Sequence, residues 1–190
     1  MPTLRINVPV WLYLEQAHFL RARAGENLRR EREWLAVQRE SMGLKINEPS
    51  PPGLRVALLE LRPVEWPGES HMVESAMRER LQQSPLAGPW ASLTEEERSV
   101  AGLSGRKIGS AQQDFDTLLS FDLDSGLVES ARLAAHRISE PVVAALIREN
   151  LVGRGASRSK DSVARKIELQ AEIYTLGRII RESIDLIRTP

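Results

Sequence analysis

The stretch SKDSVARKIELQAEIYTLGRIIRESIDLIR, residues 159–188, decides the fold class because it carries the longest helical pattern in the chain. Isoleucine recurs every seven residues, and leucine occupies the positions between, which gives one apolar face made of Leu169, Ile173, Leu176, Ile180 and Ile187. This spacing predicts a long helix over about 161–188 whose apolar face must pack on something. Packing within the chain's own core is the favoured interpretation, and packing against a partner subunit or a second copy is the alternative.

The rest of the sequence also favours helices. Only 5% of the residues are aromatic, and 42% are hydrophobic. Helices are expected near 70–83, 95–102, 110–120 and 126–138, and a further one begins at Ser139-Glu140-Pro141 and ends at Gly153. Thr94 and Glu97 form a capping-box pattern, and Asp124 or Ser125 is expected to cap the next helix. The prediction is a mainly α protein, a bundle of five to seven helices with a short N-terminal strand and a long C-terminal helix.

The N-terminus has a different pattern. Leu4, Ile6 and Val8 alternate with polar residues, which is typical of a short strand. Pro9 then stands where a helix can begin, and residues 10–42 read as helical with a break at Gly25.

Breaker residues suggest three segments. The stretch NEPSPPG at 47–53 is the clearest boundary, and residues 54–61 are ambiguous between a strand and a short helix. We expect an N-terminal strand and helix or helical hairpin in 1–46, a connector rich in proline and glycine with one helix in 47–93, and a helical bundle in 94–190. No internal repeat is visible in the sequence.

Composition limits the functional classes. The chain has 26 basic and 26 acidic residues, so net charge indicates no partner class. The absence of cysteine excludes disulfides and thiolate metal sites. With no signal-peptide pattern at residues 1–5 and no long apolar run, we expect a soluble, cytoplasmic protein with no membrane partner.

Patterns that would indicate catalysis are incomplete. The Glu15 and His18 spacing matches half of a di-iron motif, but no second Glu-x-x-His accompanies it. The Asp122–Gly126 stretch begins like a calcium loop and lacks the later ligands. Nucleotide-binding glycine motifs and a nucleophile elbow are missing from the sequence. We therefore expect no enzyme activity, no cofactor, no metal and no small-molecule substrate.

A basic loop precedes the C-terminal helical pattern. Glycine, serine hydroxyls and the start of a helix surround a cluster of cations that could contact nucleic-acid phosphates: Arg154, Arg158, Lys160, Arg165 and Lys166. An ordinary solvated loop is the equally weighted alternative.

The N-terminus also resembles the ribbon-helix-helix family of DNA-binding modules. Thr3, Arg5 and Asn7 lie on one face of the expected strand, a helix follows, and Gly25 stands where the turn to a second helix belongs. The resemblance implies a strand that pairs across a dimer and reads the major groove with its polar face. The charged run Arg29–Glu33 departs from that family's apolar second helix.

The leading hypothesis is a non-catalytic helical subunit of a larger assembly that binds the nucleic-acid backbone through its basic C-terminal loop. The alternatives are a protein-only scaffold or adaptor, and a DNA-binding regulator that acts through its N-terminal strand.

Overall fold

The computed structural model describes residues 4–44, 49, 51–62, 65–95, 97, 115–153, 156 and 159–189. These residues form two strands and six helices: β1 (Arg5–Leu12), α1 (Leu14–Ser41), α2 (Leu54–Glu60), α3 (Glu69–Arg80), β2 (Thr117–Asp124), α5 (Ser125–Arg148), α6 (Lys160–Glu172) and α7 (Leu176–Arg188). The predicted mainly α fold with an N-terminal strand and a helical C-terminus is confirmed.

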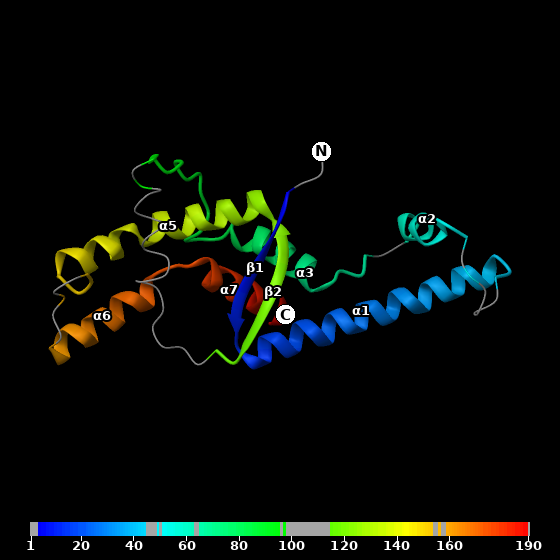
Figure 1. Cartoon of the computed structure of the whole chain (residues 1–190), viewed down its shortest axis with the longest axis horizontal. Helices are drawn as coiled ribbons and strands as arrows, with labels where there is room; N and C mark the ends of the chain where they lie inside the picture. Colours follow the sequence, from blue (N-terminus) through cyan, green and yellow to red (C-terminus); the bar gives the residue numbers. More distant parts are fainter. Residues whose placement is uncertain are drawn as a thin grey trace.

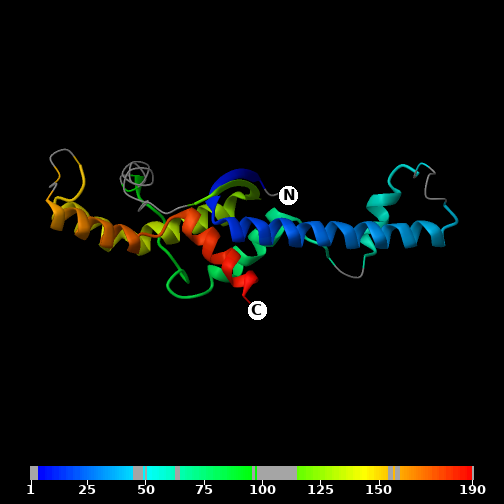
Figure 2. The ribbon, with the colours of Figure 1, turned by 90° about the horizontal axis from the view of Figure 1, so that it is seen from below.

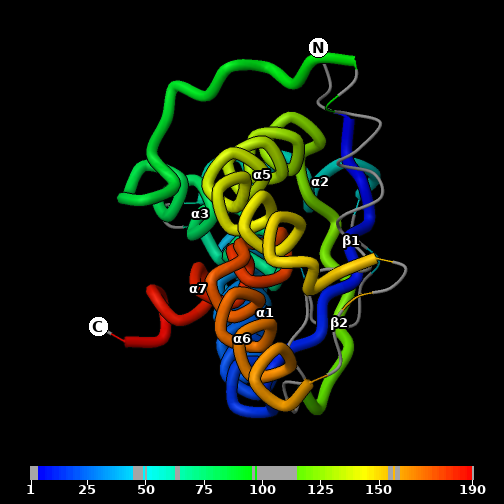
Figure 3. The backbone as a smooth tube through the Cα atoms, turned by 90° about the vertical axis from the view of Figure 1, so that its left-hand side faces the viewer, coloured from blue at the N-terminus to red at the C-terminus, as the bar shows by residue number. Residues whose placement is uncertain are grey.

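The molecule is elongated, with a central core and two helical arms (Figure 1). Strands β1 and β2 pair as an antiparallel ribbon over the core. Figure 2 shows the ribbon above α3 and α7, with the far half of α1 leading away to one side and α5 with α6 to the other. The view along the long axis in Figure 3 places the ribbon to one side of α1, α3 and α7. Exposed and buried side chains alternate along both strands, so one ribbon face is covered and the other is open.

The core lies between the ribbon and the helices beneath it. Its fully buried side chains come from both strands, from α1, α3, α5 and α7, and from the turn after α3. The largest are Leu12, Leu20, Met77, Leu86, Phe121, Leu123, Ile179, Ile180 and Ile184. A smaller cluster of Leu146, Leu151, Leu169 and Ile173 holds the α5–α6 arm together. Apolar burial on this scale is the main favourable term in folding.

Strand β1 continues through Pro9, so the predicted helix start at that proline is wrong. The Asp122 amide donates to Ser70 Oγ at 3.0 Å, outside the ladder, so Asn7 and Asp122 form a non-hydrogen-bonded pair. Such pairs alternate along an antiparallel ladder, and Pro9–Ser120 is therefore another. The missing N–H of Pro9 costs no ladder bond there, which is why the strand tolerates it.

Strand β2 replaces part of the predicted helix over 110–120. Residues 117–120 are extended and pair with β1, while 110–114 lie outside the described residues. Leu119, Phe121 and Leu123 face the core, and the exposed Leu118 interrupts the apolar–polar alternation. Pairing with a distant strand decides the conformation here.

Helix α1 has no break at Gly25, contrary to the prediction. It runs unbroken from Leu14 to Ser41, and a side chain at Gly25 would meet only open space. Glycine within a helix costs about 0.5–1 kcal/mol relative to alanine. Asn27, two residues on, donates to the Pro67 carbonyl at 2.9 Å and holds the helix in place beyond the glycine.

Helix α5 also passes the predicted boundary at Ser139-Glu140-Pro141 without ending. Pro141 lies inside it, although proline removes one helical hydrogen bond. Ala134 and Ala135 pack in the central core before this point, and Leu146 packs in the arm cluster after it. The favourable free energy of packing on both sides of Pro141 outweighs the cost of the lost helical hydrogen bond. The predicted N-cap is confirmed, since Asp124 Oδ1 accepts from the Leu127 amide at 2.8 Å.

The single helix predicted over about 161–188 is wrong: the C-terminus forms two helices, α6 and α7, separated by Ile173, Tyr174 and Thr175. The Tyr174 amide donates to Ser139 Oγ at 2.8 Å, and Thr175 Oγ1 accepts from the Arg178 amide at 3.1 Å. Two hydroxyls thus satisfy the backbone groups that the interruption frees.

The middle of the chain follows its local sequence signals more closely. Helix α3 confirms the helix expected near 70–83, and α2 shows that residues 54–60 are helical. The Thr94–Glu97 capping box is confirmed by reciprocal hydrogen bonds of 2.7 and 3.2 Å. The helix expected over 95–102 lies largely outside the described residues.

The division into three segments stays a prediction, although β1 of the first segment pairs with β2 of the third.

Candidate nucleic-acid interface

The open face of the ribbon carries exposed side chains from both strands. Strand β1 exposes Asn7, Pro9 and Trp11 on this face, and β2 exposes Leu118, Ser120 and Asp122. The register places them in three cross-strand pairs, Asn7–Asp122, Pro9–Ser120 and Trp11–Leu118. All three are non-hydrogen-bonded pairs, in which facing side chains approach most closely.

One end of this face is polar and internally paired. Arg5 Nε donates to Asp122 Oδ2 at 3.2 Å, and Arg5 Nη2 donates to Glu74 Oε2 at 3.1 Å and to the Asp122 carbonyl. Burial alone would raise the pKa of Glu74, but the hydrogen bond from Arg78 and the charges of Arg5 and Arg78 hold it below its ordinary value. Arg5 is therefore held in place, and Asn7 presents its exposed amide on the same strand.

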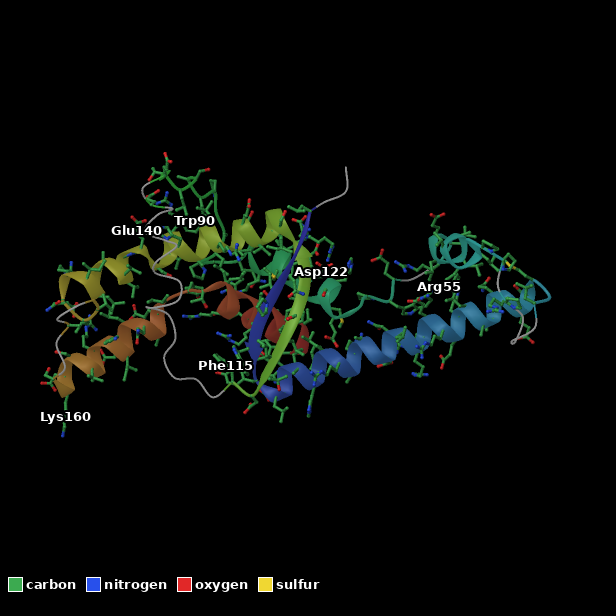
Figure 4. All side chains as sticks on the ribbon, in the orientation of Figure 1. Arg55, Trp90, Phe115, Asp122, Glu140 and Lys160 are labelled. Carbon is green, nitrogen blue, oxygen red and sulfur yellow. The ribbon has the colours of Figure 1, made fainter. Side chains whose placement is uncertain are left out.

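The other end of the face is apolar. Trp11 is 52% exposed and Leu118 is 48% exposed, and they lie opposite each other in the ladder. Arg181 supports this end from beneath: its Nη1 donates to the Trp11 carbonyl at 2.9 Å, and its guanidinium stacks on the Phe115 ring at 4.0 Å. Burial lowers the pKa of Arg181 below its ordinary value. In Figure 4, Phe115 and Asp122 mark the two opposite ends of the ribbon.

Of the predicted phosphate-binding cations, Arg154 and Arg158 lie outside the described residues. Lys160 is exposed at the first position of α6, at the tip of the α5–α6 arm (Figure 4), and Lys166 lies two turns further on. Arg165 donates to Glu149 and to Glu168, each at 3.2 Å. These hydrogen bonds raise the pKa of Arg165 and pair its guanidinium with two carboxylates.

The predicted packing face is divided between two places. Leu169 and Ile173 are buried in the arm cluster, whereas Ile180 is buried in the central core, with Leu176 and Ile187 partly buried against it. All five side chains contact other residues of this chain, and packing against a partner stays a prediction.

The Thr94–Glu97 turn is tied to α5 by an ion pair. Arg137 Nη1 donates to Glu97 Oε1 at 2.7 Å, and Arg137 Nη2 donates to Glu97 Oε2 at 3.1 Å. This bidentate geometry is the strongest form of an arginine–carboxylate contact. The hydrogen bond from Arg137, helped by the Thr94 amide, lowers the pKa of Glu97 to about 2.

We expect the Glu97 contact to weaken in acid. A carboxyl whose pKa is lowered on folding stabilises the fold above its ordinary pKa of 4.5, and that contribution disappears as the pH falls toward 2. An NMR titration of the Glu97 carboxyl should give a midpoint near pH 2, and Arg137→Gln should raise it. Arg132→Gln, an exposed change on the same helix, is the control, and equal Glu97 midpoints in the two variants would contradict the assignment.

The other motifs weighed in the sequence have structural partners. Glu15 forms a 2.8 Å ion pair with Arg188, Asp122 binds Arg5, and Asp124 caps α5. Within the described part of the chain, no group of three or more histidine, aspartate or glutamate side chains could hold a metal ion. None of the helices in that part is long and apolar enough to cross a membrane.

No protein-family model, curated protein or solved structure matches this chain. The candidate interface therefore rests on its own geometry. Arg5 and Asn7 were predicted from the alternation in β1, but Trp11, Leu118, Ser120 and Asp122 were missed as members of this face. The sequence signal for the three β2 residues is the alternation in 119–123, which the adjacent Leu118 obscures, and Trp11 lies beyond the predicted strand.

Proposed function

We propose that the chain is a non-enzymatic protein that binds double-stranded DNA with the open face of the β1–β2 ribbon. The observation that carries the proposal is the ribbon itself, which is covered by helices on one face and presents hydrogen-bonding side chains on the other. The major groove of B-DNA is wide enough to admit a two-stranded ribbon. The resemblance of the N-terminus to the ribbon-helix-helix family rests on the strand alone, because α1 has no turn at Gly25. In that family the strand is the element that enters the major groove.

The side chains on the ribbon suit base recognition. Asparagine can bind adenine through two hydrogen bonds, and aspartate can accept from the amino group of cytosine. Asn7 and Asp122 face each other across the ladder, with Ser120 beside them. Because Arg5 already binds Glu74 and Asp122, its main role is to position the Asp122 carboxylate.

Backbone contacts would come from elsewhere. Phosphate contacts supply affinity without reading sequence, and Arg5, the cation at the polar end of the ribbon, is already paired. We propose that the basic C-terminal loop supplies these contacts. Its exposed described member is Lys160, at the tip of the arm that leads away from the ribbon (Figure 4). Helix α5 is long enough, about 36 Å at 1.5 Å per residue, to carry that loop along the duplex.

The ribbon is tested by selection from a random duplex library, followed by titration of the enriched duplex. We expect Asn7→Ala to weaken binding to this duplex by about ten-fold or more, because one good base contact is worth about 1–3 kcal/mol. Gln82→Ala, which removes an amide side chain in the turn after α3, away from the ribbon face, should leave the affinity unchanged. The absence of any enriched duplex, or equal affinities for the two variants, would contradict the proposal and favour a protein-only scaffold.

The basic loop has a separate signature in the salt dependence. Replacing Arg154, Arg158 and Lys160 together by alanine should reduce the slope of log affinity against log salt by about one for each phosphate that the loop no longer binds. The relative affinities for different base sequences should stay the same. A slope equal to that of the unmodified protein would show that the loop does not contact the phosphates.

A further inference from the structure

The two ends of the chain form structurally equivalent halves. A half-turn about the viewing axis of Figure 1, through the middle of the ribbon, brings α1 onto α5, α2 near α6 and α3 onto α7. Each half thus consists of a strand, a long helix that leads into an arm, and a shorter helix under the ribbon. The sequence of one half does not repeat in the other, so the equivalence is visible only in the fold.

Burial follows the same pattern in the two long helices. Tyr13 and Asp124 are the N-caps of α1 and α5. Counted from these caps, the third, fourth and seventh residues are buried in both helices: Gln16, Ala17 and Leu20 in α1, and Leu127, Val128 and Ala131 in α5.

The two shorter helices match equally well. Gly68 and Thr175 are their N-caps, and the fourth, fifth, eighth and ninth residues after them are buried in both: Met72, Val73, Ala76 and Met77 in α3, and Ile179, Ile180, Ser183 and Ile184 in α7. Each short helix is also anchored at the residue before its cap. Asn27 of α1 donates to the Pro67 carbonyl at 2.9 Å, and Ser139 of α5 donates to the Tyr174 carbonyl at 3.3 Å and accepts from the Tyr174 amide at 2.8 Å.

This pseudo-twofold axis passes through the Pro9–Ser120 pair. Counted back from the caps Tyr13 and Asp124, Pro9 and Ser120 hold the same place in their strands, and they also face each other in the ladder. The pairs on either side of the axis are chemically different. Asn7 and Asp122 lie on one side, and Trp11 and Leu118 lie on the other.

We infer that the chain binds as a single copy to a non-palindromic DNA sequence, with a thymine-containing segment under Trp11 and Leu118. The inference rests on the proposed DNA-binding function. A homodimer presents the same side chains on both sides of its axis and therefore fits a palindrome. Here one chain supplies both strands, so the two sides can bind different bases.

Contact with thymine follows from the chemistry of the apolar end. The C5-methyl of thymine is the apolar group of the major groove, and apolar side chains recognise it. Trp11 and Leu118 are about half exposed. They lie on the same ribbon face as Asn7 and Asp122, with the Pro9–Ser120 pair between the two pairs. The polar end of the ribbon offers hydrogen bonds to amino and carbonyl edges, so the two ends prefer different base steps.

The experiment is selection with the full chain on a random duplex library, followed by light scattering of the complex with the enriched duplex. We expect a complex of one chain with one duplex, and an enriched sequence without dyad symmetry. Replacing the enriched thymines by deoxyuridine, which removes only the methyl groups, should weaken binding about four-fold for each buried methyl. Trp11→Ala should abolish this sensitivity to deoxyuridine, whereas Asn7→Ala should retain it.

The outcomes separate this inference from the function on which it rests. A palindromic enriched sequence, two chains on one duplex, or binding that does not change with deoxyuridine would overturn the inference while leaving DNA binding in place. Enrichment of no duplex would overturn both. Leu118→Ala, on the opposite strand, provides a second variant, and it should also reduce the deoxyuridine effect because its side chain lies opposite Trp11.

Discussion

Alanine in place of Phe121 is expected to lower the free energy of unfolding by about 3–5 kcal/mol, the range for removing a large aromatic side chain from a well-packed core. Phe121 is fully buried and lies opposite Val8 in the ladder, between the ribbon and the helices beneath it. Small proteins are stable by about 5–15 kcal/mol in total, so this single change would remove a large part of the stability. Urea unfolding followed by circular dichroism measures the loss.

The control is on the same strand. Leu118→Ala removes a side chain from the open face of β2, and surface substitutions change stability by about 0.5 kcal/mol or less. Phe121→Leu, which keeps much of the apolar volume, remains measurable if Phe121→Ala fails to fold. A loss for Leu118→Ala as large as that for Phe121→Ala would show that the ribbon does not turn its Phe121 face toward the core.

Features that depend on neighbours in the sequence could be predicted from it. Thr94 and Glu97 are three residues apart, and the hydrogen bonds of a capping box require nothing else. The same is true of Asp124 as an N-cap and of the helix near 70–83. Local chemistry decides these elements, and the sequence contains all of it.

The ribbon could be predicted only in part, because its second strand is distant in the chain from its first. The alternation at Ile6 and Val8 indicated β1, but nothing local shows that β1 continues through Pro9. That proline is accepted because of its place in the register with β2. Residues 117–120 join a strand for the same reason, although Leu118 and Leu119 together suit a helix equally well.

The helix boundaries predicted from the sequence were wrong where tertiary contacts outweigh the local preferences of the residues. Gly25 and Pro141 are breakers by intrinsic preference, yet both lie inside long helices that are packed on either side. The candidate interface likewise depends on contacts between residues that are distant in the sequence. Asn7 could be found from β1 alone, whereas its neighbour Asp122 is brought to it only by strand pairing.

Replacing Ser139 by alanine is expected to lower the free energy of unfolding by about 1–3 kcal/mol, the cost of leaving a buried polar group without its partner. Ser139 is buried in the middle of α5, and its hydroxyl accepts from the Tyr174 amide at 2.8 Å. That amide lies at the interruption between α6 and α7, where no helical carbonyl can replace the hydroxyl. Thermal or urea unfolding gives the loss, and hydrogen exchange at the Tyr174 amide locates it.

A matched control lies on the same helix. Ser130 donates to the Gly126 carbonyl on an exposed face of α5, so Ser130→Ala should change stability little and leave exchange at Tyr174 unaltered. The equivalent anchor in the other half, Asn27, holds Pro67 at 2.9 Å, and Asn27→Ala should produce a similar loss. If the two halves are equivalent in energy as well as in geometry, the two variants will lose similar amounts of unfolding free energy. Each substitution will also speed hydrogen exchange first in the short helix of its own half. Faster exchange throughout the core in Ser139→Ala, with no excess at Tyr174, would instead show that the hydroxyl contributes to general packing and is not an anchor for α7.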